Sequence, residues 1–144
     1  MNSEEVMRIL GIDYGDVRVG LAVSDPTGLI AGGIGIVKIS GMNNAVEQIV
    51  GVIAERQIES VVLGLPLNMD GSEGPSASKI RAFASKLNEK LPDLPIEYID
   101  ERRSSILAAD YMTETGTFGK KRKESVDTLS AQIILQTYLD RNRK

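Results

Sequence analysis

Three acidic positions in this sequence stand where apolar residues are expected. The first is Asp13, which follows the run Leu10–Ile12, and this run predicts a buried strand. A carboxylate that is buried without a partner is costly. Asp13 is therefore either a structural residue bonded to backbone or to Arg18, or part of a functional site. The sequence alone leaves both interpretations open.

The second position is the pair Asp100 and Glu101, at the carboxyl end of a strand predicted over residues 95–100. In open α/β sheets, ligands bind outside the carboxyl ends of the strands, which favours a functional role for one of these acids. The alternative is structural, because acids in front of a helix predicted over residues 103–114 would cap its free N–H groups.

The third position is Asp127, near the start of a helix predicted over residues 125–140. An acid in the first turn of a helix is often explained by the helix dipole. The spacing favours a different role here, since Asp127 shares a helix face with Ala131, Ile134 and Tyr138. We therefore expect its side chain to lie near a buried stripe.

The chemistry open to these acids is limited by what the chain lacks. It contains no histidine and no cysteine, so any metal ion must be bound through oxygen, as Mg²⁺ or Mn²⁺ is. Two such ions about 4 Å apart activate water and stabilise the leaving oxygen in phosphodiester cleavage. A cation would also give Asp13 a partner, and we expect Gly11 and Gly15 to leave room for a phosphate or backbone to approach.

Basic residues gather near the end of the sequence. The net charge is −3, yet residues 116–144 contain seven basic and three acidic residues. Four of the basic residues form a run that we expect in a loop: Lys120, Lys121, Arg122 and Lys123. Such a run is usually only a solvated surface. If the acids bind metal ions, the same loop is placed to contact a phosphate backbone, the contact that dominates nucleic-acid affinity.

The elements that position these residues follow from the hydrophobic periodicity. The length of 144 residues predicts one domain, 1–144, with residues 1–6 as a short extension. Strands are predicted over residues 7–14, 17–24, 30–39, 60–66 and 95–100, with a type II′ turn at Gly15-Asp16. Helices are predicted from Asn43 or Asn44 to Gln57, from Pro75 onward, and over 103–114 and 125–140. This order predicts a mixed sheet with helices on both faces.

The hydropathy of the sequence and its polar start disfavour a membrane protein and a secreted protein. No stretch approaches the roughly 20 apolar residues of a membrane span. The acidic and polar start MNSEEVMR is unlike a signal peptide. We therefore expect a cytoplasmic protein that does not bind membranes.

Four blocks of the sequence, taken in order, resemble the YqgF (RuvX) family of small bacterial proteins. They are GIDYGDVRVGLAVSD, GLPLNMDGSEGPSA, IDERRSS and VDTLSAQIILQTYLD, and the resemblance runs from about Met7 to Asp140. The family has an RNase H-like α/β fold related to Holliday-junction resolvases. The resemblance thus implies a five-stranded mixed sheet of order 3-2-1-4-5, flanked by helices.

The resemblance also implies which residues form the site. It assigns Asp13, Glu101 and Asp127 as catalytic acids and metal ligands, with Glu101 favoured over Asp100. Arg18 and Arg102 match family positions as well, where they would contact phosphate or fix the acids.

The activity implied is that of a nuclease dependent on Mg²⁺ or Mn²⁺, which hydrolyses phosphodiester bonds in structured RNA during processing of the 16S rRNA precursor. The sequence does not set the oligomeric state, and both a monomer and a homodimer stay open. One alternative is a resolvase of Holliday junctions or other branched DNA. Another is a non-catalytic RNA-binding factor in ribosome assembly. GIDYGDVRVG also resembles the first phosphate loop of sugar kinases and actin, although the chain is short for that two-lobed arrangement.

Overall fold

A computed structural model describes residues 8–100 and 119–142 of the chain. The helix predicted over 103–114, the extension over 1–6 and the site residues Glu101 and Arg102 lie outside these ranges. Within them, no helix is long and apolar enough to cross a membrane.

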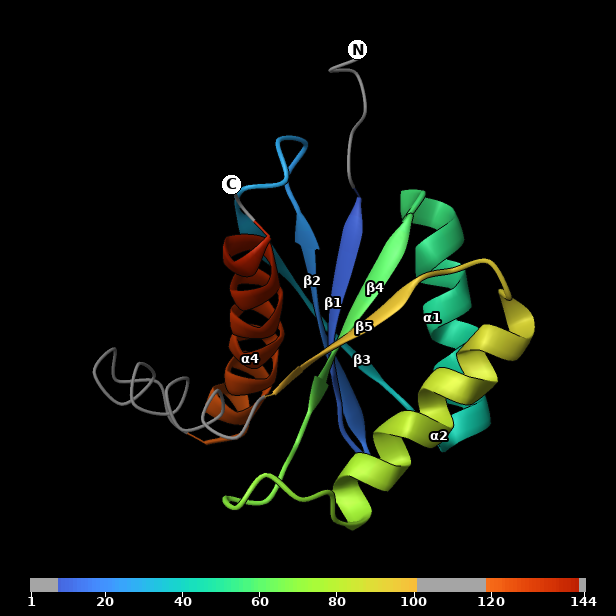
Figure 1. Ribbon diagram of the computed structural model, residues 1–144, viewed down its shortest axis with the longest axis vertical. Helices are drawn as coiled ribbons and strands as arrows, with labels where there is room; N and C mark the ends of the chain where they lie inside the picture. The colour runs from blue at the N-terminus through green and yellow to red at the C-terminus, as the bar shows by residue number, and fades with distance from the viewer. Residues whose placement is uncertain (1–7, 101–118, 143–144) are drawn as a thin grey trace.

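The centre of the molecule is a five-stranded sheet in the order β3-β2-β1-β4-β5 (Figure 1). Its strands are β1 (Ile9–Tyr14), β2 (Arg18–Ser24), β3 (Ala31–Lys38), β4 (Ser60–Leu65) and β5 (Ile96–Asp100). The β1–β2 and β2–β3 pairs are antiparallel, whereas β1–β4 and β4–β5 are parallel. The predicted mixed sheet and its order are both confirmed.

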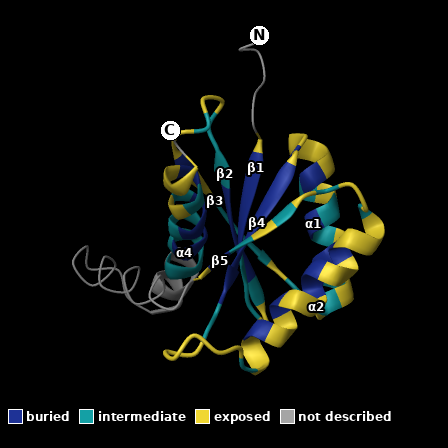
Figure 2. Ribbon diagram, viewed as in Figure 1, coloured by how far each residue is buried: buried dark blue, intermediate teal, exposed yellow. Residues whose placement is uncertain are grey.

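Helices cover the two faces of this sheet (Figures 1 and 2). Helices α1 (Met42–Arg56) and α2 (Pro75–Lys90) lie on one face, and α4 (Gly119–Arg141) lies on the other. Helix α2 begins at its proline, as predicted, because the fixed φ of proline suits a first helical position. The predicted asparagine cap of α1 is wrong, since Gly41 with φ of 123° occupies the cap position and no side chain caps the helix.

Successive residues of β1 point to opposite faces of the sheet, and they therefore belong alternately to two apolar cores, one on each face. Leu10 and Ile12 belong to the core under α1 and α2. Ile9 belongs to the core under α4. Asp13 follows at even spacing from Ile9, so it lies on the α4-facing side of the sheet.

Two local predictions are wrong. The predicted two-residue turn at Gly15-Asp16 does not form, because Tyr14 pairs with Val19 and four residues separate this pair. Gly15 also lacks the positive φ that a type II′ turn requires. The basic run Lys120–Lys123 lies within α4 and not in a loop. Lysine and arginine are good helix formers, and here the helix that follows extends back through them.

Candidate functional site

The carboxyl end of β1 and the amino-terminal half of α4 meet at one edge of the sheet, at the bottom of Figure 1. A cavity of about 320 Å³ opens there. Its lining residues come from β1, the hairpin that follows, β2 and α4: Asp13, Gly15, Asp16, Val17, Arg18 and Asp127. Two of the three sequence-predicted acidic positions therefore share one cavity with Arg18.

Arg18 is tied to one of these acids by a direct ion pair. Its Nε donates to Oδ2 of Asp127 over 2.9 Å, and the two side chains are only 17% and 26% exposed. This bond joins residues 109 positions apart. It fixes the orientation of the Asp127 carboxylate toward the cavity, where partial burial protects the pair from the screening that weakens surface ion pairs.

The capping interpretation of Asp127 is wrong. Helix α4 begins at Gly119, so Asp127 lies about two turns into the helix, beyond the free N–H groups of the first turn. The expectation of an inward-facing side chain is confirmed, since Asp127 is partly buried and Ala131 and Ile134 further along its face are fully buried.

Asp100 is on the other side of the sheet from this cavity. It pairs in register with Leu65, and Leu65 belongs to the core under α1 and α2. Its neighbour Ile99 belongs to the core under α4. Asp100 is therefore not brought together with Asp13 and Asp127, and Glu101 lies outside the described residues.

The height of α4 above the sheet is set by a glycine. Gly20 stands opposite Asp13 in the β1–β2 register, and the backbone carbonyl of Asp127 lies directly on it. A Cβ at Gly20 would approach that oxygen far inside 3.0 Å, a separation that real Cβ contacts do not cross. The lack of a side chain at Gly20 thus lets the Asp127 backbone come down beside Asp13.

The clearance predicted at Gly11 and Gly15 for a phosphate or backbone is used by the protein's own packing at both positions, and Gly15 also lines the cavity. A Cβ on Gly11 would lie 2.7 Å from Cβ of Leu135, so this glycine makes room for α4. A Cβ on Gly15 would lie 2.6 Å from the carbonyl oxygen of Arg18, so this glycine makes room for the hairpin itself. Both serve close approach of protein to protein.

One residue of the cavity wall was interpreted from the sequence only as a turn residue. Asp16 lines the cavity and also accepts a hydrogen bond from Nζ of Lys79, in α2, over 3.0 Å. Burial of the ring and, second to it, the negative charge of Asp16 raise the pKa of Tyr14 above the usual 10.0. Only the long-range contact with Lys79, invisible in the local pattern, distinguishes Asp16 from an ordinary turn acid.

The loop between β4 and α2 is held by a third ion pair, between Glu73 and Arg81. Arg81 of α2 binds both carboxylate oxygens of Glu73, over 2.8 and 2.6 Å, and its guanidinium stacks 4.7 Å from the ring centre of Tyr98 in β5. The hydrogen bond from Arg81 lowers the pKa of Glu73. The Glu73 carboxylate is thus already engaged in holding its own loop.

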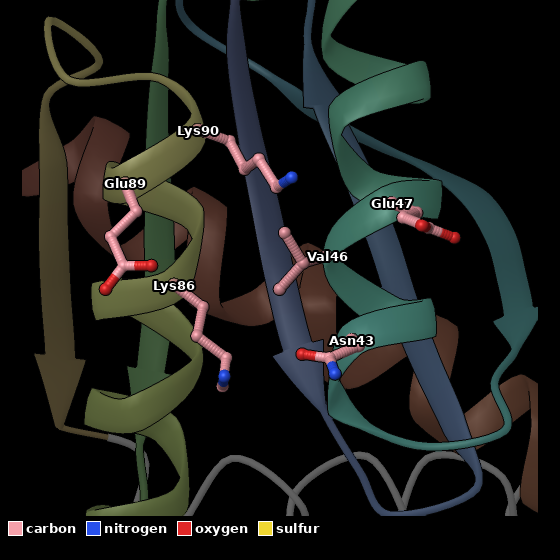
Figure 3. A pocket seen from close by; sticks show the side chains of 6 residues that line it. All are labelled: Asn43, Val46, Glu47, Lys86, Glu89 and Lys90. Atoms are coloured by element: carbon pink, nitrogen blue, oxygen red, sulfur yellow. The ribbon is translucent and has the colours of Figure 1, made fainter.

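A further cavity of about 340 Å³ lies between α1 and α2 (Figure 3). Its lining residues are Asn43, Val46, Glu47, Lys86, Glu89 and Lys90. Positive and negative side chains alternate around it, and all of the charged ones are exposed. It lies on the opposite face of the sheet from the acids, so it has no part in their chemistry.

Substitution of Arg18 by lysine tests the role of the ion pair. We expect kcat for any reaction at this cavity to fall about 10- to 100-fold, because an ammonium cannot reproduce the directed Nε bond that orients Asp127. The free energy of unfolding should change by about 1 kcal/mol or less. Steady-state kinetics and thermal melting measure the two effects, with Arg56→Lys, in the last turn of α1 on the far face, as the matched control. Equal kcat in both variants would contradict an orienting role.

The fold and the acid-lined cavity together define a class of protein. The chain resembles RuvC from T. thermophilus, solved in complex with a Holliday junction substrate, with a TM-score of 0.58 and 17% identity over 92% of this chain and 93% of that one. It also resembles the Holliday junction resolvase of fowlpox virus, with a TM-score of 0.58 and 15% identity over 94% and 99% of the two chains. These similarities show an RNase H-like fold.

Sequence comparison narrows this class to one family. Residues 7–141 match the family model described as "RuvX: Holliday junction resolvase". A relative from Natranaerobius thermophilus is 42% identical over 94% of this chain and 95% of its own. Another from Halothermothrix orenii is 41% identical over 96% and 98%. Both carry the name "Putative pre-16S rRNA nuclease". The chain belongs to the RuvX family.

Proposed function

We propose that this protein is a metal-dependent nuclease that hydrolyses phosphodiester bonds in structured RNA, with the 16S rRNA precursor as its substrate in the cytoplasm. The observation that carries the proposal is the shared cavity of Asp13, Arg18 and Asp127 at one edge of an RNase H-like sheet. The names of the full-length relatives support RNA as the substrate.

The donor atoms of the cavity fit a hard divalent cation. Carboxylate oxygens are the ligands that Mg²⁺ and Mn²⁺ prefer, and Asp13 of β1 and Asp127 of α4 supply them in the lining of one cavity. Within residues 8–100 and 119–142 there is no group of three such ligands. We propose Glu101 as the third acid, because Asp100 belongs to the far side of the sheet. A bound ion would polarise a phosphate and lower the pKa of a bound water.

The side chains of this protein prepare the site for that ion. Arg18 holds Asp127 in one orientation through Oδ2, so the carboxylate does not have to be ordered when substrate arrives. The Arg18 guanidinium also keeps a positive charge beside two carboxylates, which reduces the repulsion of an incoming phosphate. Arg18 therefore has a positioning role first, and an electrostatic role toward substrate second.

The basic part of the chain supplies contacts to the nucleic-acid backbone. The run at the start of α4 precedes Asp127 on the same helix, so it is close to the cavity in space as well as in sequence. We propose that its side chains and Arg102 bind phosphates of the substrate: Lys120, Lys121, Arg122 and Lys123.

Removal of divalent metal provides the direct test. Purified protein should cleave a precursor 16S rRNA fragment in Mg²⁺ or Mn²⁺, lose all cleavage in a chelator, and regain it when the metal is restored. Product mapping on gels measures the cut. Tight binding of the precursor with no cleavage in either metal would contradict the proposal and favour a non-catalytic role in ribosome assembly.

A second candidate function is resolution of branched DNA. It is favoured by the description of the matching family and by the resolvases that share the fold. Cleavage of a four-way DNA junction under the same conditions, compared with the rRNA fragment through kcat/KM, separates the two substrates. A ratio that favours the junction would overturn the preference for RNA.

A further inference from the structure

The hairpin between β1 and β2 is anchored at three successive residues. The Asp16 carboxylate accepts a hydrogen bond from Lys79 of α2 over 3.0 Å. The Val17 carbonyl accepts one from the backbone N–H of Ile39 over 2.9 Å. The Arg18 guanidinium binds Asp127 of α4. Contacts on three sides therefore hold the hairpin tip in one place relative to the acids.

The side chain at the middle of these three residues is apolar and faces solvent. Val17 lines the cavity and is 59% exposed. Single exposed apolar residues are common and need no explanation by themselves. Val17 differs because it is part of the wall of a cavity whose other side chains are charged, and because its backbone is fixed on both sides.

We propose that Val17 is a specificity-determining residue that packs against the base of an unpaired nucleotide beside the phosphate at the acids. The inference rests on the proposed function, since it assumes a nucleic acid in this cavity. A nucleotide combines an anionic phosphate with an apolar base face, and the cavity offers Arg18 for the first and Val17 for the second. In a stacked duplex the base faces are covered by their neighbours, so only an unstacked nucleotide presents its face to Val17.

The consequence is a preference for RNA with unpaired nucleotides at the cut. Regular duplex would contact the same phosphate-binding groups but leave Val17 against solvent. The preference for structured RNA would therefore originate at the hairpin tip, while the acids and the basic run act on any phosphate backbone.

The test uses two RNA oligonucleotides of equal length and charge. One carries an unpaired nucleotide in a duplex, and the other carries an abasic residue at the same place. Affinity is measured by fluorescence anisotropy in an Asp13→Asn background, which prevents cleavage. Val17→Thr replaces one methyl by a hydroxyl of similar shape. Ile30→Thr is the matched control, because Ile30 is 62% exposed and lies in the β2–β3 turn at the opposite end of the sheet (Figure 1).

We expect Val17→Thr to weaken binding of the RNA with the unpaired nucleotide about fourfold, as removal of one buried methyl predicts. Binding of the abasic RNA should not change, and Ile30→Thr should change neither. An equal effect of Val17→Thr on both RNAs, no effect on either, or no measurable binding of either would overturn the inference. Cleavage by the unsubstituted protein is assayed separately. A base-dependent loss of affinity without any cleavage would refute the nuclease and leave the base contact intact.

Discussion

Replacement of Asp13 by asparagine should lower the rate of RNA cleavage at least about a thousandfold, the scale on which loss of one group that stabilises transition-state charge acts. Asparagine keeps the size of the side chain and removes its charge, so the cavity keeps its shape and loses an anionic ligand. Single-turnover cleavage of a precursor fragment measures the rate. The melting temperature is measured for the same variant, so that a loss of cleavage is separated from a loss of folded protein.

The matched control is Asp93→Asn. Asp93 is exposed in the connection between α2 and β5, near the amino end of β5, and so at the opposite edge from the cavity. Cleavage by that variant should equal that of the unsubstituted protein.

Asp127→Asn should be as inactive as Asp13→Asn and also less stable, since it weakens the partner of a mostly buried Arg18. Full activity of both variants would exclude this cavity as the site of cleavage.

Substitution of Gly20 by alanine should disturb both stability and activity. The new methyl group would meet the backbone carbonyl of Asp127, and a helix backbone cannot rotate away as a side chain can. Either α4 rises from the sheet or β2 moves, and overpacking of this kind costs about 3 kcal/mol. The melting temperature should fall by about 10 °C. A shift of Asp127 by about 1 Å should lower kcat about a hundredfold, even under conditions where the variant is folded.

The control for this experiment is Gly32→Ala, in β3 of the same sheet. Among the described residues, a Cβ at Gly32 would have one neighbour within 4 Å, an oxygen of Val23 at 3.9 Å, which is ordinary van der Waals contact. Its melting temperature and kcat should stay near those of the unsubstituted protein. If Gly20→Ala melts and cleaves like Gly32→Ala, then the approach of α4 to the sheet is not fixed by Gly20.

The sequence predicted most elements well because periodicity is a local signal. The run SVVLGLP reads as a strand covered on both faces, and β4 is buried along its whole length. The start of α2 follows from Pro75 alone. Strand order cannot be predicted from local periodicity, because strand pairing joins distant segments of the chain. The predicted order came from resemblance to a family and not from the residues themselves.

The candidate site could be predicted where an acid interrupts an apolar pattern. It could not be predicted where the role of a residue depends on a contact with a residue far away in the sequence. Asp13 and Asp127 stand out in their own segments. The partner of Arg18 lies 109 residues away, and the space above Gly11 is filled by Leu135. No local pattern reports either contact. The start of α4 was missed because the run Lys120–Lys123 was expected in a loop, although lysine and arginine are good helix formers.

Two of the acids that line the cavity, Asp13 and Asp127, come from β1 and α4, the first and last elements in the described part of the chain. A ribosome synthesises a protein from its amino end, and a domain generally folds as a unit. A nascent chain that has not yet reached α4 lacks Asp127 and leaves Arg18 without this anchor. Under the proposed function, an unfinished copy would therefore be harmless to the ribosomal RNA around it, and cleavage would become possible only once translation of α4 is complete.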